Sequence, residues 1–97
     1  KPSTCPIRPA AKCAHADLSG LDLSYANLAG ADLKGADLRG TRLVGANLEN
    51  SSLQNANLEG ADLSYTRMTN ALTDGSDFTE TITKSTKCNS CFSKRKF

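Results

Sequence analysis

The stretch ADLSG LDLSY ANLAG ADLKG ADLRG TRLVG ANLEN SSLQN ANLEG ADLSY, residues 16–65, contains a motif that repeats every five residues. The third residue of each unit is leucine ten times in succession, and the first residue is small in most units. Met68 and Phe78 continue this series of central residues, whereas Thr73 and Thr83 interrupt it. The ten leucines are Leu18, Leu23, Leu28, Leu33, Leu38, Leu43, Leu48, Leu53, Leu58 and Leu63.

A period of five matches neither the 3.6-residue period of a helix nor the two-residue period of a strand. Within one unit, the small residue and the leucine are two positions apart, so they share one face of a short extended segment. Glycine occupies the fifth position in seven units, and glycine tolerates the positive φ that a sharp corner needs. An extended side followed by a corner predicts a coil, and stacked coils can pair their backbones about 4.8 Å apart.

The units ADLKG, ADLRG, ANLEG and ADLSY resemble those of the pentapeptide-repeat family. The resemblance covers residues 16–85 and implies an all-β fold, a right-handed quadrilateral β-helix (a β-solenoid) with four units per coil. At about 4.8 Å per coil, about 3.5 coils give a stack roughly 17 Å tall. We therefore expect residues 1–15 to form an N-terminal cap, residues 16–85 the β-helix, and residues 86–97 a C-terminal cap with a basic tail.

Two segments depart from the regular pattern. At Leu72 and Ile82, an apolar residue takes the normally polar second position while threonine takes the centre. We expect the coils to become irregular from Leu72 onward. Residues 8–13 could form a short helix that covers the first coil, because Pro9 suits the first turn of a helix.

Composition excludes several classes of protein. Only 38% of the 97 residues are hydrophobic and tryptophan is absent, so a conventional core of large side chains is not expected. No apolar run approaches the roughly 20 residues that a membrane span needs. The net charge of +2 with 23% charged residues does not fit a disordered polyelectrolyte.

If four units make a coil, residues 20 apart stack on one face. Asp22, Arg42 and Asp62 then form a column, with Tyr25 and Tyr65 on the same face. One interpretation is that these are exposed ion pairs worth about 0–1 kcal/mol each. The other is that Tyr25, Arg42 and Tyr65 form an interaction face, because Tyr and Arg are enriched among interface anchors. By the same stacking, Arg39 is expected to face Glu59.

The four cysteines lie outside the leucine series: Cys5 and Cys13 precede it, and Cys88 and Cys91 follow it. The two ends of the predicted stack are about 17 Å apart, whereas disulfide-bonded Cα atoms lie within roughly 7 Å. This favours Cys5–Cys13 and Cys88–Cys91 disulfides. A redox-active pair or a zinc site at Cys88 and Cys91 stays open as an alternative. Paired cysteines and a chain that opens at Lys1 favour an extracytoplasmic location: periplasmic, lumenal or secreted.

Catalytic motifs are not recognisable in the sequence. The sole histidine, His15, precedes the first leucine unit, and there is no phosphate-binding loop, HExxH motif or EF-hand loop. The aspartates occupy the polar position of the repeat, which is typical of turn and surface residues. We expect no enzymatic activity, no cofactor and no metal site.

The leading hypothesis is a structural or protein-interaction module, a monomer or weak oligomer with an unknown protein partner and no nucleic acid. The family resemblance supplies an alternative, because some members imitate duplex DNA and protect DNA gyrase. Residues 14–83 hold all ten acidic residues and only four basic ones, which favours that alternative. The short stack and the basic ends argue against it. Thiol–disulfide chemistry at Cys88 and Cys91 is a lesser alternative.

Overall fold

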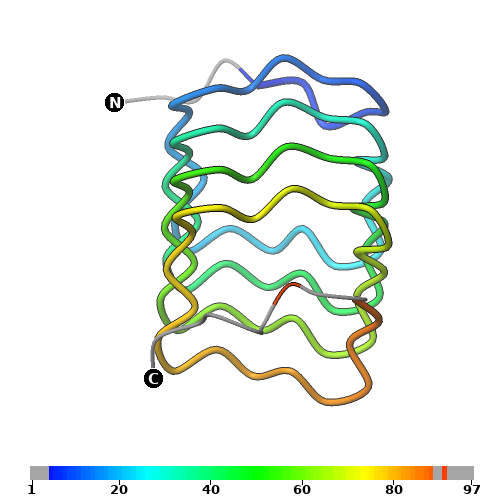
Figure 1. The fold of residues 1–97 in the computed structure, drawn as a ribbon, viewed down its shortest axis with the longest axis vertical. Coiled ribbons are helices and arrows are strands. Elements are labelled where there is room, and N and C mark those ends of the chain that lie inside the picture. Colours follow the sequence, from blue (N-terminus) through cyan, green and yellow to red (C-terminus); the bar gives the residue numbers. More distant parts are fainter. Residues whose placement is uncertain (1–4, 89–90, 92–97) are drawn as a thin grey trace.

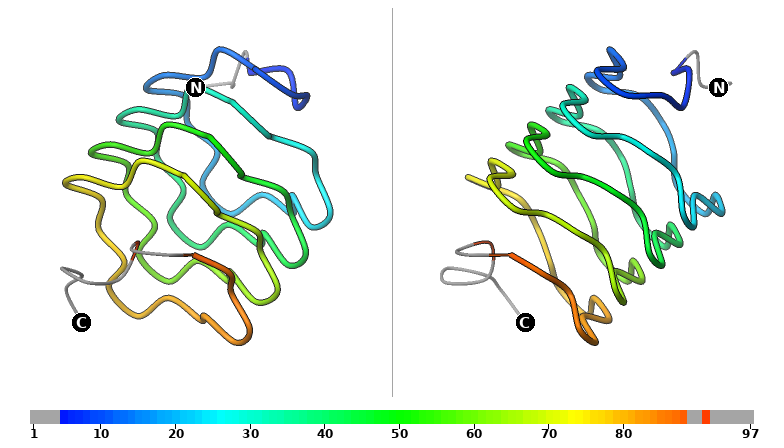
Figure 2. Two further views of the ribbon diagram at one scale, coloured as in Figure 1. Left: turned by 45° about the vertical axis from the view of Figure 1, so that its right-hand side comes forward. Right: turned by 90° about the vertical axis from the view of Figure 1, so that its right-hand side faces the viewer.

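The structure, a computed structural model, describes residues 5–88 and 91. The chain winds into a right-handed quadrilateral β-helix, with its coils stacked from the blue end to the orange end (Figure 1). The rotated views in Figure 2 show successive coils following the same path around one axis. The Cα atoms extend over 31 × 21 × 21 Å. The all-β solenoid expected from the repeat is confirmed.

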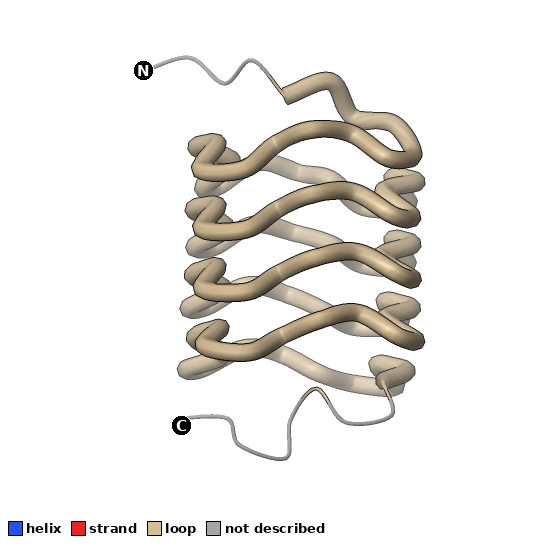
Figure 3. The backbone as a smooth tube through the Cα atoms, turned by 45° about the horizontal axis from the view of Figure 1, so that its top comes forward, coloured by secondary structure: helices blue, strands red, loops and turns tan. Residues whose placement is uncertain are grey.

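Neighbouring coils are joined by parallel β-bridges between residues 20 apart. At the bridge between Asp22 and Arg42, the Leu23 N–H donates to the Arg42 carbonyl at 2.7 Å, and the Arg42 N–H donates to the Leu21 carbonyl at 2.9 Å. Each unit contributes a single bridge residue, so the described residues contain no helix and no continuous strand (Figure 3). The predicted register of four units per coil is therefore confirmed.

The fifth residue of each unit forms a corner with positive φ. Gly20, Gly40 and Gly60 have φ between 64° and 70°, in the left-handed region where a side chain costs energy. The next unit starts with a turn hydrogen bond, as from the Ala26 N–H to the Leu23 carbonyl at 3.0 Å. Nine corners use other residues: Ala10, His15, Tyr25, Asn50, Asn55, Tyr65, Asn70, Glu80 and Ser85.

The preference for Asp or Asn before the central residue has a local cause. The Asp17 Oδ1 accepts the N–H of Ser19 at 3.1 Å, and the Asn47 Oδ1 accepts the N–H of Glu49 at 2.9 Å. This contact satisfies a backbone donor next to the corner, as in an Asx turn. The same hydrogen bond recurs at Asp22, Asn27, Asp32, Asp37, Asn57, Asp62 and Asp77.

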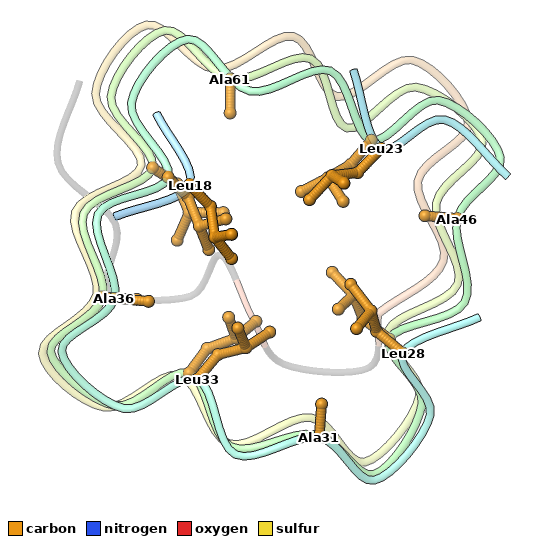
Figure 4. Close-up of a cluster of buried hydrophobic side chains, with 14 of the residues drawn as sticks. Leu18, Leu23, Leu28, Ala31, Leu33, Ala36, Ala46 and Ala61 are labelled. Carbon is orange, nitrogen blue, oxygen red and sulfur yellow. The ribbon is translucent and has the colours of Figure 1, made fainter. Parts of the chain in front are cut away.

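The interior is filled by four stacks of leucine side chains, with alanines between them. Figure 4 shows Leu18, Leu23, Leu28 and Leu33 pointing to the centre of the square. Nine of the ten leucines are at most 1% exposed; Leu23 is 8% exposed. Where threonine replaces alanine, its hydroxyl finds a partner, as Thr41 Oγ1 donates to the Leu18 carbonyl at 2.8 Å. Burial of leucine in register is thus the main source of stability.

The expectation that the coils become irregular from Leu72 is wrong. Leu72 bridges Ser52 and Ile82 bridges Asp62, both in the normal register. Their side chains point outward and are 52% and 54% exposed. The coil persists because backbone pairing with the preceding coil does not depend on which side chain occupies the outward position.

The short helix expected at residues 8–13 is also wrong. Ala10 is a corner with φ 58°, and Lys12 forms a β-bridge with Asp32. Lys12 thus belongs to the coil pattern at the first end, as Lys87 does at the last, where it bridges Arg67. The division into caps and β-helix stays a prediction, and residues 92–97 of the basic tail lie outside the described residues.

Candidate interaction face

Opposite charges stack on one side of the β-helix. Arg42 forms β-bridges with both Asp22 and Asp62, and its Nε lies 4.0 Å from the Asp22 Oδ1. The Arg42 and Asp22 side chains are 62% and 69% exposed, so solvent screens the pair and it adds little to stability. Both charges remain accessible to a partner. We call this side the tyrosine face; it consists of residues 21–25, 41–45, 61–65 and 81–85.

Two tyrosines stand at corners of the tyrosine face. Tyr25 has φ 65° and Tyr65 has φ 60°, a backbone region that costs a tyrosine about 1 kcal/mol. Their side chains are nevertheless accessible, with 79% and 51% of each residue exposed. Neither burial nor backbone preference explains a tyrosine at these positions.

Most of the exposed large hydrophobic residues gather on the tyrosine face. Ile82 points outward there with the two tyrosines, and Leu21 takes the inward first position of its unit at the open end of the first coil. Leu72 and Ile7 lie on other sides. The Lys84 Nζ lies 5.9 Å from the centre of the Tyr65 ring, within cation–π range. The face combines aromatic, aliphatic and charged groups, a composition typical of protein-binding surfaces.

The structure places the predicted site residues Tyr25, Arg42 and Tyr65 on one side, as their spacing indicated. Ile82 and Lys84 also belong to this face, although they are not among the predicted site residues. Their positions, 20 residues after Asp62 and Ser64, were a sufficient signal.

A second side of the β-helix is rich in acidic groups, and we call it the acidic side. Asp17, Asp37 and Asp77 share one column, in which Asn57 fills the remaining position. Arg39 lies on this side and donates to both carboxylate oxygens of Asp37, at 2.8 and 2.7 Å. The acidic side consists of residues 16–20, 36–40, 56–60 and 76–80.

The expected ion pair between Arg39 and Glu59 is not formed. In the described part of the chain, Arg39 forms its ion pair with Asp37 of its own unit. Asp37 is two positions away on the same extended segment, so its carboxylate can meet the guanidinium in a two-pronged geometry. A contact within one unit is therefore preferred here to one between coils.

Several carboxyl groups have lowered pKa values. The hydrogen bond from the Arg39 guanidinium lowers the pKa of Asp37, and the same contact raises the pKa of Arg39. The Ser19 hydroxyl lowers the pKa of Asp17. The backbone N–H of Ser64 lowers that of Asp62. These carboxyl groups are ionised at neutral pH, which is the opposite of a carboxyl prepared to donate a proton in catalysis.

The four cysteines form two local disulfides, Cys5–Cys13 and Cys88–Cys91, with Cα–Cα distances of 5.0 and 5.6 Å. Cys13 and Cys88 stand at the central position of their units, where other units have leucine. Cys13 is 2% exposed and Cys91 is 6% exposed. Each disulfide thus adjoins one end of the leucine core.

His15 occupies a corner with φ 61°, and its ring lies over Gly35 in the next coil. Within residues 5–88 and 91, no group of three or more His, Cys, Asp or Glu side chains is placed to hold a metal ion. The same part of the chain has no helix with the length and hydropathy that a membrane span requires.

The repeat and the fold both match known proteins. The family model for pentapeptide repeats matches residues 11–50 and 41–79, with eight copies. Among solved structures, the chain is similar to a pentapeptide repeat protein from the thylakoid lumen of Arabidopsis thaliana, with 27% sequence identity and a TM-score of 0.78. That match covers 81% of this chain and 57% of the other. No curated protein matches the chain.

Two further structures resemble the chain less well. A pentapeptide repeat protein from the cyanobacterium Cyanothece 51142 is 33% identical, with a TM-score of 0.48, over 86% of this chain and 60% of that one. QnrB1, a plasmid-mediated fluoroquinolone resistance protein, is 20% identical, with a TM-score of 0.49, over 76% and 40% of the two chains. The chain spans less than two thirds of the length of each of these three proteins.

Proposed function

Because this chain belongs to the pentapeptide-repeat family, we propose that it is a non-enzymatic solenoid that binds a protein partner through its tyrosine face. The β-helix supplies a rigid support, and the function depends on side chains at its surface. We also propose that the regular β-helix has about 3.5 coils. Residues 1–15 and 86–97, in which Lys12 and Lys87 continue the bridge pattern, would cap its ends, since open coil edges need covering.

The exposed tyrosines at strained corners carry this proposal. Seven other corners are glycine, which takes the same backbone conformation without strain. Tyr25 and Tyr65 are less favourable there, and most of the Tyr25 side chain contacts solvent. Contacts with the neighbouring coil leave most of the Tyr25 side chain exposed, so an aromatic side chain held at a strained corner supports a role in binding.

Arg42 strengthens the proposal. It lies on the same face between two aspartates, with its guanidinium exposed. Arg and Tyr together account for many of the residues that dominate binding energy in protein interfaces. Asp22 forms an ion pair with Arg42, and the carboxylates of Asp22 and Asp62 offer acceptors to a partner.

Two observations support a location outside the cytoplasm. Disulfides persist in oxidising compartments, and this chain has two of them. The similar Arabidopsis thaliana protein comes from the thylakoid lumen. We propose a lumenal, periplasmic or secreted location.

A second candidate function, imitation of DNA, is favoured by the column of Asp17, Asp37 and Asp77 on the acidic side. A DNA mimic must present negative charge continuously, because duplex DNA carries one charge per about 1.7 Å. Here Asn57 interrupts the column and Arg39 neutralises Asp37. The acidic side is therefore a poor imitation of DNA, and the tyrosine face is the better candidate for binding a partner.

Site-specific photo-crosslinking tests the leading proposal. A photoreactive phenylalanine derivative replaces Ser64 on the tyrosine face, and in a second variant it replaces Gln54, which holds the same place in its unit on the opposite side. The variants are produced in the source organism, and crosslinked products are identified by mass spectrometry. We expect a defined protein adduct from position 64 and none from position 54.

The adduct at position 64 should disappear when Tyr25 is replaced by Gly, which keeps the corner geometry and removes the ring. Adducts of equal yield from both positions, or an adduct that survives Tyr25→Gly, would contradict the proposal.

A further inference from the structure

The charges on the tyrosine face are arranged so that the face complements itself. Asp22, Arg42, Asp62 and Ile82 follow one another at equal steps of one coil. If a second copy faces this column in the opposite direction with all four coils overlapping, Arg42 lies opposite Asp62 of the second copy. Asp62 then lies opposite Arg42 of that copy. Two parallel copies would instead place Asp22 against Asp22 and Arg42 against Arg42, which is unfavourable.

The two ends of the face follow the same symmetry. Asp22 belongs to the first coil of the face, and the outward-facing Ile82, 54% exposed, belongs to the last. An antiparallel pair places the first coil of one copy against the last coil of the other. Ile82 therefore lies opposite Asp22 of the second copy at both ends, and Lys84 approaches the same Asp22 carboxylate.

The two edges of the face also fit a close approach. The Tyr25 ring lies over Gly45, and the antiparallel arrangement brings Tyr65 of the second copy to the level of Gly45, so that the two rings can meet. The other edge is formed by Gly20, Gly40, Gly60 and the exposed Glu80. At the three glycines, a Cβ atom would meet nothing within 4 Å. No side chain at these three glycines obstructs the second copy.

From these complementary features we infer that the tyrosine face binds a second copy of this chain, as a two-fold symmetric antiparallel pair. The inference rests on the proposed function, because it names the partner of the same face. The face is about as wide as the 21 Å cross-section and spans four coils about 4.8 Å apart. The area of a face with this width and height lies well below the roughly 800 Å² that each partner buries in a standard interface, so the dimer is weak and reversible.

Sedimentation equilibrium up to about 1 mM protein, where a weak complex becomes populated, measures the association. Arg42→Asp places two pairs of aspartates opposite each other across the dimer, and Asp62→Arg places two pairs of arginines. Each variant alone should associate at least about tenfold more weakly than the wild type. An equimolar mixture of the two variants restores both opposite-charge pairs, so association should return.

Arg67→Asp is the matched control, because it makes the same charge change to a bridge residue on a different side. It should leave the association constant unchanged. Circular dichroism and thermal unfolding verify that each variant folds. If a charge-reversed variant is unfolded, the wild type is tested instead for weakening of association by salt, which screens exposed charge pairs.

A wild type that stays monomeric at about 1 mM, or a mixture that associates no better than the separate variants, would overturn the dimer. These results would leave the proposed function standing if position 64 still crosslinks to a different protein. Failure of position 64 to form any adduct, with itself or with another protein, would instead refute the proposed function.

Discussion

The ring of Tyr25 lies over Gly45 in the next coil, so that a Cβ atom on Gly45 would come within 2.7 Å of the Tyr25 Cε1 atom. His15 has the same relationship with Gly35, where the Cβ atom would lie 2.5 Å from the histidine Nδ1. A large corner side chain thus leans over a glycine 20 residues further along the chain. The corner residues of neighbouring coils are therefore coupled.

This coupling predicts that Gly45→Ala is more destabilising than Gly30→Ala. Both glycines have positive φ, at 68° and 71°, but a Cβ atom at Gly30 meets nothing within 4 Å. Gly30→Ala should therefore cost only the backbone strain, about 1 kcal/mol. Gly45→Ala should cost a further 0.2–1 kcal/mol or so, because the Tyr25 ring must move away. Urea unfolding measures both values.

The double variant Tyr25→Ala/Gly45→Ala isolates the contact. Once the ring is absent, the cost of Gly45→Ala should fall to that of Gly30→Ala. If Gly45→Ala lowers the free energy of unfolding by the same amount in the Tyr25→Ala background, the Tyr25 ring does not lie over Gly45.

Leucine burial predicts a large contrast between Leu43→Ala and Leu72→Ala. Leu43 is completely buried, so its truncation should lower the free energy of unfolding by about 2–5 kcal/mol. Leu72 is 52% exposed, and its truncation should cost less than about 1 kcal/mol. Thermal or denaturant unfolding makes the comparison, and similar losses at the two positions would contradict the outward orientation of Leu72.

Stability should decrease in acid because of Asp37. Its pKa in the folded protein is lowered from 3.8 by the Arg39 guanidinium, so its contribution is complete above pH 4 or so and is lost as the pH falls through the lowered pKa. Asp37→Asn should therefore be less stable than the wild type at pH 7, and the stabilities of the two proteins should converge as the pH falls through the lowered pKa of Asp37. Arg39→Gln should reduce the acid sensitivity in the same way. Urea unfolding at a series of pH values tests this, and parallel stability curves would refute it.

The two disulfides should survive in solution as local pairs. Digestion without reduction, followed by mass spectrometry, should yield one peptide pair that contains Cys5 and Cys13 and a separate product that contains Cys88 and Cys91. A crosslinked peptide that joins the two ends of the chain would contradict the pairing. Stoichiometric zinc with free thiols would favour the metal-site alternative.

The chain should neither inhibit DNA gyrase nor protect it from quinolones. Arg39 and Asn57 interrupt the negative charge of the acidic side. A protein must present continuous negative charge to compete with DNA for a DNA-binding groove. Supercoiling assays at physiological salt with the purified chain test this. Dose-dependent inhibition that is lost when Asp17, Asp37 and Asp77 are changed to Asn would promote the DNA-mimic candidate.

Most of the candidate site can be predicted from the sequence. Once the register of 20 residues is known, Tyr25, Arg42 and Tyr65 must share a side, and the same rule places Ile82 below Asp62. The ion-pair partner of Arg39 cannot be predicted from the sequence. Stacking of the coils makes Glu59 a neighbour of Arg39, but the actual partner is Asp37 in the same unit. Only the conformation of the Arg39 side chain distinguishes the two.

The coil, its register and its core follow from the repeat, because each five-residue unit contains a small residue, a polar residue that closes the turn, and a leucine that must be buried. The orientation of the residues that depart from the repeat depends on contacts between coils. Leu72 and Ile82 face solvent, Lys12 and Lys87 join the bridge pattern, and Tyr25 leans over Gly45. Backbone pairing with the adjacent coil fixes the orientation of every residue. The free energy gained by burying one exceptional side chain is too small to break that pairing.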